Sequence, residues 1–183
     1  MNWPDAPWTR GELRISRAAI EAVERDAIAG YEADQEACGY LAGPASDPLL
    51  CDRAEAIENL AKLLHERDPA TFFHPARKFF AFPEKTLEAA MRDGVERSSP
   101  VKILYHSHLD VGAYLSGTDE AVLSRGSPPT FIGGGATLGP GPAWPLAFLV
   151  SSVRRGDHGP HVDDHRLFIW KDRRFEPTTF ELV

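Results

Sequence analysis

Two histidines separated by one residue, His106 and His108, have a spacing that could support metal chemistry. In an extended strand this spacing points both imidazoles to one face, whereas Ser107 points to the other, where we expect packing or a supporting hydrogen bond. Asp119 follows a short turn and lies three residues after Ser116, at the start of a predicted helix. Two imidazoles and a carboxylate form the ligand set of a catalytic zinc that keeps one position open for water. The pattern therefore predicts a metal-dependent hydrolase.

The start of this helix also allows a structural interpretation. Ser116 and Asp119 have the spacing of a capping box, in which both side chains bond to the backbone of the first turn. The two interpretations are compatible, because a carboxylate in a first turn can cap the helix or bind a metal. Asp110 extends the histidine pair to His-x-His-x-Asp, similar to the metallo-β-lactamase signature, but position 111 is valine where that signature needs histidine. We therefore predict that Asp110 is a solvated loop residue.

A second group of histidines occurs at 157–165, with the sequence D-H-G-P-H-V-D-D-H. Its composition would suit a metal ion, but the segment falls between two apolar stretches that are expected to be strands. We predict a polar hairpin loop in solvent, with a secondary metal site as the alternative. His65 and His74 have no partner pattern and are expected at the surface.

The elements that position the first site are a strand and a helix. The apolar run from Val101 predicts a half-buried strand carrying both histidines, and a helix is expected over 117–124. Further helices are predicted over 16–31 and 84–97, with a possible turn at 60–65; further strands are predicted over 36–43, 49–57, 78–82, 146–153, 166–170 and 175–183. This mixture predicts an α/β or α+β fold around one sheet.

The two long helices carry signals of their own. Ser16 suits the N-cap of the first, and Gly30 marks its expected end. In the second, Leu87, Met91 and Val95 recur at four-residue spacing and predict a stripe facing the core.

Composition limits the classes of protein. A chain of 183 residues with a net charge of −7 suits one globular domain and argues against a general nucleic-acid or anionic-membrane surface. No apolar run approaches the ~20 residues of a membrane span, and the first residues lack a signal-peptide pattern. Cys38 and Cys51 are too few for a thiolate zinc site or a disulfide scaffold, and we expect both to be buried in a cytoplasmic protein.

Two stretches are expected outside the core. Residues 1–12 hold two tryptophans and two prolines and predict an irregular arm on the surface. Residues 126–142 are too rich in Gly and Pro for regular structure and predict an inserted loop. Such a long loop is usually either functional or disordered.

Together, the site residues resemble the JAMM (MPN+, JAB domain) zinc metalloprotease family. The family pattern is a distant glutamate, then His-x-His-Pro, then Ser-x-x-Asp. This chain has Glu36, then H-S-H-L at 106–109, then S-G-T-D at 116–119. Glu36 also opens E-A-C-G-Y-L-A-G, which is similar to a strand of the family.

The resemblance covers roughly residues 16–180 and departs from the family at Leu109 and Leu115, where proline is usual. Both departures concern the shape of a loop and leave the ligands in place. The resemblance implies a single MPN-type domain over 1–183, of the stand-alone bacterial type, with a mixed, mainly antiparallel curved sheet flanked by helices.

The resemblance also implies a role for each site residue. His106, His108 and Asp119 would bind one zinc ion per chain. Glu36 would orient a water molecule and remove its proton, and Ser116 would donate a hydrogen bond to the oxyanion of the tetrahedral intermediate. Without the resemblance, Glu36 would be interpreted as a solvated surface carboxylate.

The implied substrate is the C-terminal tail of a ubiquitin-like protein, cut during deconjugation or precursor processing. Processing of a sulfur-carrier protein by the same chemistry is an alternative, as is a non-catalytic MPN scaffold that binds a protein partner. The loop 126–142 follows the site helix and would clamp the substrate, unless it is a disordered insertion. Nucleic acid and membrane are not expected as partners, whereas the oligomeric state and the pathway, antiviral defence or metabolism, stay open.

Overall fold

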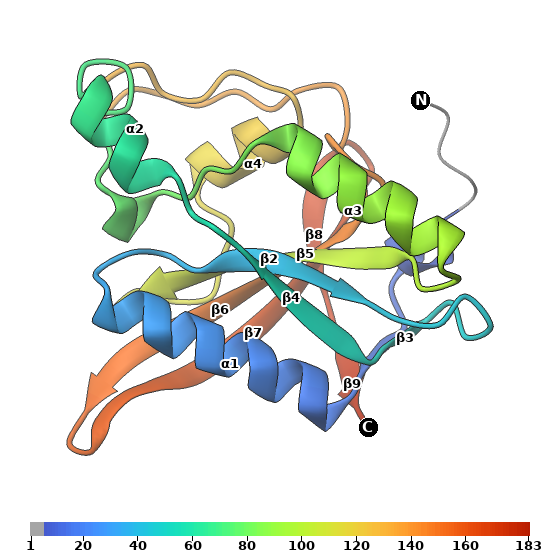
Figure 1. Ribbon diagram of the computed structural model, residues 1–183. Coiled ribbons are helices and arrows are strands. Elements are labelled where there is room, and N and C mark those ends of the chain that lie inside the picture. The colour runs from blue at the N-terminus through green and yellow to red at the C-terminus, as the bar shows by residue number, and fades with distance from the viewer. Residues whose placement is uncertain (1–5) are drawn as a thin grey trace.

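The computed structural model describes residues 6–183 as a central sheet with helices on both faces (Figure 1). The helices are α1 (Arg17–Glu32), α2 (Ala61–Arg67), α3 (Glu84–Glu96) and α4 (Gly117–Leu123), with the short 3-10 helices η1 (Pro7–Arg10) and η2 (Ala76–Lys78). The strands are β1 (Leu13–Ile15), β2 (Cys38–Ala42), β3 (Leu50–Cys51), β4 (Arg53–Ile57), β5 (Val101–Leu109), β6 (Ala147–Gly156), β7 (Gly159–Lys171), β8 (Arg174–Thr178) and β9 (Phe180–Leu182). The predicted mixed α/β class is confirmed.

The larger sheet places the histidine-bearing strand at its centre. Its six strands have the order β4-β2-β5-β6-β7-β8, and β5 and β6 form its parallel pair. The remaining neighbours run antiparallel, as the mainly antiparallel prediction required. In this register, Cys38 and Val150 lie on either side of His106. Because β5 is hydrogen-bonded on both edges, its side chains have fixed positions.

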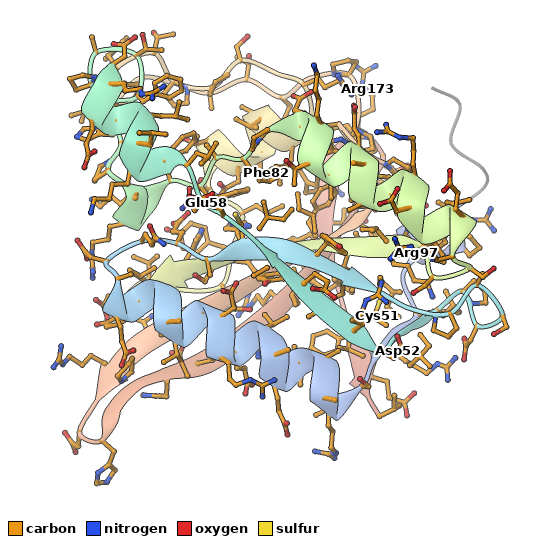
Figure 2. The ribbon with its side chains drawn as sticks, viewed as in Figure 1. Cys51, Asp52, Glu58, Phe82, Arg97 and Arg173 are labelled. Carbon is orange, nitrogen blue, oxygen red and sulfur yellow. The ribbon has the colours of Figure 1, made fainter. Side chains whose placement is uncertain are left out.

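The side chains of β5 alternate between two apolar clusters on opposite faces. Leu104 packs in the cluster that contains Leu87 of α3, whereas Ile103 packs in the cluster that contains Val23 of α1. In Figure 1, α1 and α3 accordingly lie on opposite sides of the sheet. Side chains fill the space between α3 and the sheet, where Phe82 packs against the first cluster (Figure 2).

A second, three-stranded parallel sheet has the order β3-β1-β9 and was not predicted. The strand predicted over 49–57 is divided at Asp52 between this sheet and the edge of the larger one. Likewise, the segment predicted over 175–183 forms β8 in the larger sheet and β9 in the smaller one. Strands of two or three residues are too short to show alternation, so no pattern distinguishes them.

The strand predicted over 78–82 is wrong, because this segment takes its hydrogen bonds from an asparagine instead of a neighbouring strand. Ala81 N donates to Asn59 Oδ1 at 3.0 Å, and Asn59 Nδ2 donates to Phe79 O at 3.3 Å. The aromatic pattern therefore reflects the burial of Phe80, which is 9% exposed, rather than pairing with another strand.

The loop predicted over 157–165 is also wrong. β6 and β7 form a long hairpin whose strands pair up to Gly156 and Gly159, and its tip projects beyond the sheet at the lower left of Figure 1. His161 and His165 therefore lie on β7, and only the turn that contains His158 is outside the strands. The segment is polar because much of this hairpin extends past the core.

The helix predictions need smaller corrections. α1 continues through Gly30 to Glu32, because a buried glycine lets the helix pack closely on Gln35 and Ala37. In α3 the stripe continues at Gly94, whereas Val95 is 51% exposed. No helix within residues 6–183 is long and apolar enough to cross a membrane.

The two stretches expected outside the core differ in the structure. Residues 7–10 form η1 instead of irregular chain, and Trp8 is buried, with its Nε1 donating to Pro145 O at 2.8 Å. Residues 1–5 of the expected arm lie outside the described residues. The loop 126–142 is irregular apart from one bridge between Ser127 and Thr137. The bounds of the arm and of the insertion stay predictions.

Candidate metal centre

The central strand carries both histidines into a buried space. His106 and His108 are 2% and 4% exposed, and they point to the same face as Leu104. The ring of Phe80 stacks on that of His106 with centroids 4.5 Å apart. The strand fixes where the imidazoles point, and the stacked phenylalanine covers one of them.

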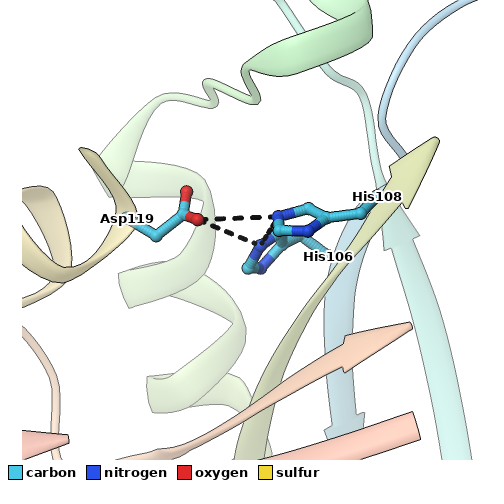
Figure 3. Close-up of side chains that lie close together, drawn as sticks. All are labelled: His106, His108 and Asp119. Atoms are coloured by element: carbon cyan, nitrogen blue, oxygen red, sulfur yellow. Dashed lines mark hydrogen bonds and ion pairs between the residues drawn. The ribbon is translucent and has the colours of Figure 1, made fainter. Parts of the chain in front are cut away.

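The carboxylate comes from α4, whose first turn forms the predicted capping box. Asp119 N donates to Ser116 Oγ at 3.2 Å, and Ser116 N donates to Asp119 Oδ2 at 2.8 Å. The same Oδ2 atom lies 3.6 Å from Nε2 of His106 and of His108 (Figure 3). Both interpretations of this carboxylate therefore hold at once: it caps the helix and it faces the two histidines.

The three ligand atoms fit a zinc ion. The Nε2 atoms of His106 and His108 are 3.2 Å apart, and ligands at about 2.0–2.1 Å in a tetrahedral zinc site are roughly 3.4 Å from one another. The Nδ1 atom of His108 lies 3.0 Å from Gly112 O, which selects the tautomer whose Nε2 is free to bind a metal. Among the described residues, no other group of three metal-ligating side chains converges in this way.

The protonation states also suit a metal. Burial lowers the pKa of the His106 imidazole, so that it is neutral near pH 7. Burial alone would raise the pKa of Asp119, but His106, His108 and Ser116 together hold the pKa of this carboxyl below its usual range. Neutral imidazole and ionised carboxylate are the forms that bind metals.

Glu36 lies next to this centre although it is seventy residues away in sequence. Cys38 is paired with His106, and Ser107 N donates to Ala37 O at 2.9 Å, so the pairing continues towards Glu36. Ala37 N in turn donates to Ser107 Oγ at 2.8 Å, which is the support predicted for that serine. Because side chains alternate, Glu36 is on the face that carries the histidines.

The carboxyl group of Glu36 is buried, at 5% residue exposure, and not solvated. Burial, with the negative charge of Asp119 as the second cause, raises the pKa of Glu36 well above its usual value. A carboxylate with a raised pKa can take up a proton and return it near neutral pH. The backbone is held as well, because Glu36 N donates to Ala76 O and Asn59 Nδ2 donates to Glu36 O, both at 2.8 Å.

Two supporting residues, Asn59 and Arg77, have no sequence pattern that identifies them. Asn59 bonds to the backbone of both Glu36 and the segment around Phe80, and so joins Glu36 to the segment whose phenylalanine stacks on His106. Arg77 forms ion pairs with Asp34 and Asp110, which follow α1 and β5. Only the aromatic run at 78–82 gave a signal, and it was interpreted as a strand.

Asp110 and the two leucines at the family's proline positions are not ligands. Asp110 lies in the loop as predicted, with a side chain 43% exposed, but it is paired with Arg77 and also accepts a hydrogen bond from Tyr31. Leu109 and Leu115 are 5% and 9% exposed. The leucines therefore fill the core beside the loop.

The second histidine group does not form a metal centre. His165 Nδ1 lies 2.9 Å from Ser151 Oγ, and its Nε2 lies 3.1 Å from Glu24 Oε1. These bonds join β7 to β6 and α1. Within residues 6–183, none of the histidines at 158, 161 and 165 belongs to a group of three ligands, so the alternative of a secondary site has no support.

Comparison with known proteins agrees with this geometry. The sequence matches the prokaryotic homologues of the JAB domain over residues 18–152. It matches none of the curated proteins with which it was compared.

Among solved structures, a protein from Desulfitobacterium hafniense is 15% identical, with 93% of this chain and 92% of that chain covered and a TM-score of 0.58. A JAB1/MPN domain protein from Archaeoglobus fulgidus is 13% identical, with 93% and 99% covered and a TM-score of 0.48. A protein from Salinibacter ruber is 19% identical, with 93% and 92% covered and a TM-score of 0.49. The first of these shows a shared fold.

The mixed sheet and its buried His-His-Asp set define a domain of the JAB/MPN class. The chain belongs to the family of prokaryotic homologues of the JAB domain, and the resemblance noted from the sequence is confirmed.

Proposed function

We propose that the protein is a zinc-dependent peptidase that cleaves after the C-terminal tail of a ubiquitin-like protein. The observation that carries the proposal is the convergence of His106 Nε2, His108 Nε2 and Asp119 Oδ2 within 3.2–3.6 Å. A hydrolase needs a base as well as a metal, and the buried Glu36 supplies one. The substrate class follows from the family resemblance.

His106, His108 and Asp119 would hold the zinc ion, which when bound lowers the pKa of water and polarises the scissile carbonyl. Glu36 accepts a proton from the attacking water as the new C–O bond forms. It then gives that proton to the departing amine nitrogen as the C–N bond breaks. Ser116 donates its hydroxyl hydrogen to the oxyanion, which its geometry allows because Ser116 Oγ acts only as an acceptor in the helix cap.

The test is cleavage of two fusion proteins, one carrying a ubiquitin-like tail and one a sulfur-carrier tail, by the wild type and by Glu36→Gln. We expect the wild type to hold about one zinc per chain and to cleave one of the fusions. Glu36→Gln keeps the zinc and loses at least about 100-fold in kcat, because no carboxylate moves the proton. Glu96→Gln, an exposed change on α3, is the matched control and stays active.

Zinc absent from the wild type, or full activity in Glu36→Gln, would contradict the proposed chemistry. Zinc bound without cleavage of either fusion would instead favour the non-catalytic scaffold.

A further inference from the structure

A pocket of about 530 Å³ opens beside the metal centre. It is enclosed by the segment after α2, by one side of α4 and by the start of the loop 126–142. In Figure 1 this loop runs from the end of α4 across to the region of α2. The volume of the pocket lies within the ~300–1,000 Å³ range of ligand sites.

Two residues of the pocket lining are next in sequence to residues of the metal centre, although none of the three candidate ligands lines the pocket itself. Thr118 lines it and is the residue before the ligand Asp119, whereas Phe79 lines it and precedes Phe80, which stacks on His106. Successive Cα atoms are about 3.8 Å apart, so the pocket begins within one residue of both. A polypeptide whose carbonyl is at the metal centre therefore has a neighbouring side chain within reach of the pocket.

The lining is aromatic and apolar, and its wall is held in place. Phe72, Phe73 and Phe79 are half-buried, and Val122 of α4, which is 41% exposed, also lines the pocket. His65 Nδ1 donates to Phe72 O at 2.6 Å. An apolar side chain that binds against this wall is stabilised, because both apolar surfaces are removed from water.

Within residues 6–183, no acidic side chain, lysine or arginine lines the pocket. His74 lines it, and burial, with Lys78 as the second cause, lowers the pKa of that imidazole, which is therefore neutral near pH 7. A charged substrate side chain would lose hydration there without a partner. The lining therefore disfavours a charged side chain of the substrate.

We infer that this pocket is a specificity subsite that takes a bulky apolar side chain of the cleaved polypeptide, close to the scissile bond. The inference rests on the proposed function and extends it from the reaction to the choice of sequence. The occupant comes either from further up the tail or from the segment beyond the cut.

The test uses a set of fusion substrates that differ only by Leu or Asp at each of the three positions on either side of the scissile bond. At one position we expect the wild type to prefer Leu by about 10-fold or more in kcat/KM, because hydrophobic pockets discriminate on this scale. That position also identifies which side of the cut supplies the side chain. No preference at any position overturns the inference.

Two substitutions locate the effect. Val122→Asp puts a charge in the pocket and Val122→Trp fills it, and both should remove the preference for Leu while zinc content stays unchanged. Val95→Asp is the matched control, since this valine is 51% exposed on α3 and does not line the pocket. A preference that survives both Val122 variants contradicts the inference.

Binding separates failure of this inference from failure of the proposed function. If the zinc-loaded wild type cleaves no substrate, the same Leu and Asp peptides are titrated into the protein. Binding is then followed by changes in the NMR chemical shifts of the protein. Binding of Leu peptides that Val122→Asp abolishes supports the pocket even when the chemistry fails. Equal binding of Leu and Asp peptides, or none, overturns the pocket.

Discussion

Under the proposed function, one side chain at the centre, Ser116, serves both the fold and the chemistry. Its oxygen accepts the Asp119 backbone N–H, and its backbone N–H holds the carboxylate oxygen that faces the histidines. The cap therefore orients the Asp119 carboxylate, and in the proposed reaction the hydroxyl hydrogen bonds to the substrate. Substitution can separate these two roles.

Ser116→Ala removes cap and donor together, and we expect it to lower the free energy of unfolding by about 1 kcal/mol. Ser116→Gly costs only a few tenths of a kcal/mol as a cap but also lacks the donor. Both variants should lose about 100-fold or more in kcat if the hydroxyl binds the oxyanion. Urea unfolding and turnover of the cleaved fusion measure the two effects, and unchanged kcat in Ser116→Gly would remove the oxyanion role.

Lys102 is a buried charge that serves the fold alone. Its Nζ donates to the carbonyl oxygens of Pro44, Asp47 and Leu50 at 3.1, 2.8 and 2.6 Å, and so closes the loop between β2 and β3. Lys102→Met leaves three carbonyls without this donor, and we expect a loss of about 3 kcal/mol in the free energy of unfolding. Chemical denaturation measures the loss, with Lys62→Met, at an exposed position of α2, as the control. Equal stability of the two variants would contradict this role.

At the scale of elements, the centre depends on how closely β2 approaches β5. Gly39 lies in β2 where an added Cβ would be 2.2 Å from Glu55 O and 2.5 Å from Tyr105 Oη. The glycine lets the tyrosine ring lie over the strand and reach Asp26, to which Tyr105 Oη donates at 2.7 Å. Gly39 thus fixes the position of β2, the strand that follows Glu36.

Gly39→Ala should therefore lower the free energy of unfolding by about 2–3 kcal/mol or more through overpacking. The control is Gly135→Ala, where nothing lies within 4 Å of an added Cβ. Thermal unfolding of both variants measures the difference. A Gly39→Ala protein as stable as the control would show that β2 can move away without cost.

The loop 126–142 is tied at its base and open at its tip. Gly139 N donates to Ser124 Oγ at 2.8 Å and Ala143 N donates to Leu123 O at 2.6 Å, so α4 anchors it. At the tip, Phe131 and Ile132 are 64% and 78% exposed. Such apolar exposure on an anchored loop suits contact with a protein substrate.

Replacing Phe131 and Ile132 together by serine tests the clamp without disturbing the anchors. We expect a stability change within about 0.5 kcal/mol, because both side chains are exposed. The KM for a protein substrate should rise about 10-fold, as expected when apolar contacts made equally in ground and transition states are lost. A short peptide substrate is the control, since it does not reach the tip. An unchanged KM for the protein substrate would contradict the hypothesis that this loop clamps the substrate.

At the scale of the whole molecule, the site predictions rested on local spacing. The pairing of His106 with His108 and of Ser116 with Asp119 depends on the period of a strand and of a helix turn, which a sequence shows directly. The place of Glu36 came from the family resemblance, because no local pattern links it to residues seventy positions away.

The features that the sequence did not predict depend mainly on contacts between segments that are distant in the chain. Asn59 acts by bonding to segments on either side of it in space, and an asparagine in the loop between β4 and α2 has no distinguishing pattern. β1 and β9 are three residues long and form through pairing with distant segments, β1 with β3 and β9, and β9 with β1. The predicted hairpin loop at 157–165 is largely paired strand, and this pairing was missed for a different reason: its polar residues pair beyond the core, where alternation of apolar residues is not required.

The central claim is that His106, His108 and Asp119 together hold one zinc ion, and a zinc titration of the metal-free protein tests it most directly. We expect about one zinc per chain in the wild type and at least about 100-fold weaker binding in His108→Ala, because a three-residue ligand set loses a ligand. His158→Ala, at an exposed turn, should bind as the wild type does. Absence of zinc binding in the wild type, or equal affinity in His108→Ala, would contradict the account.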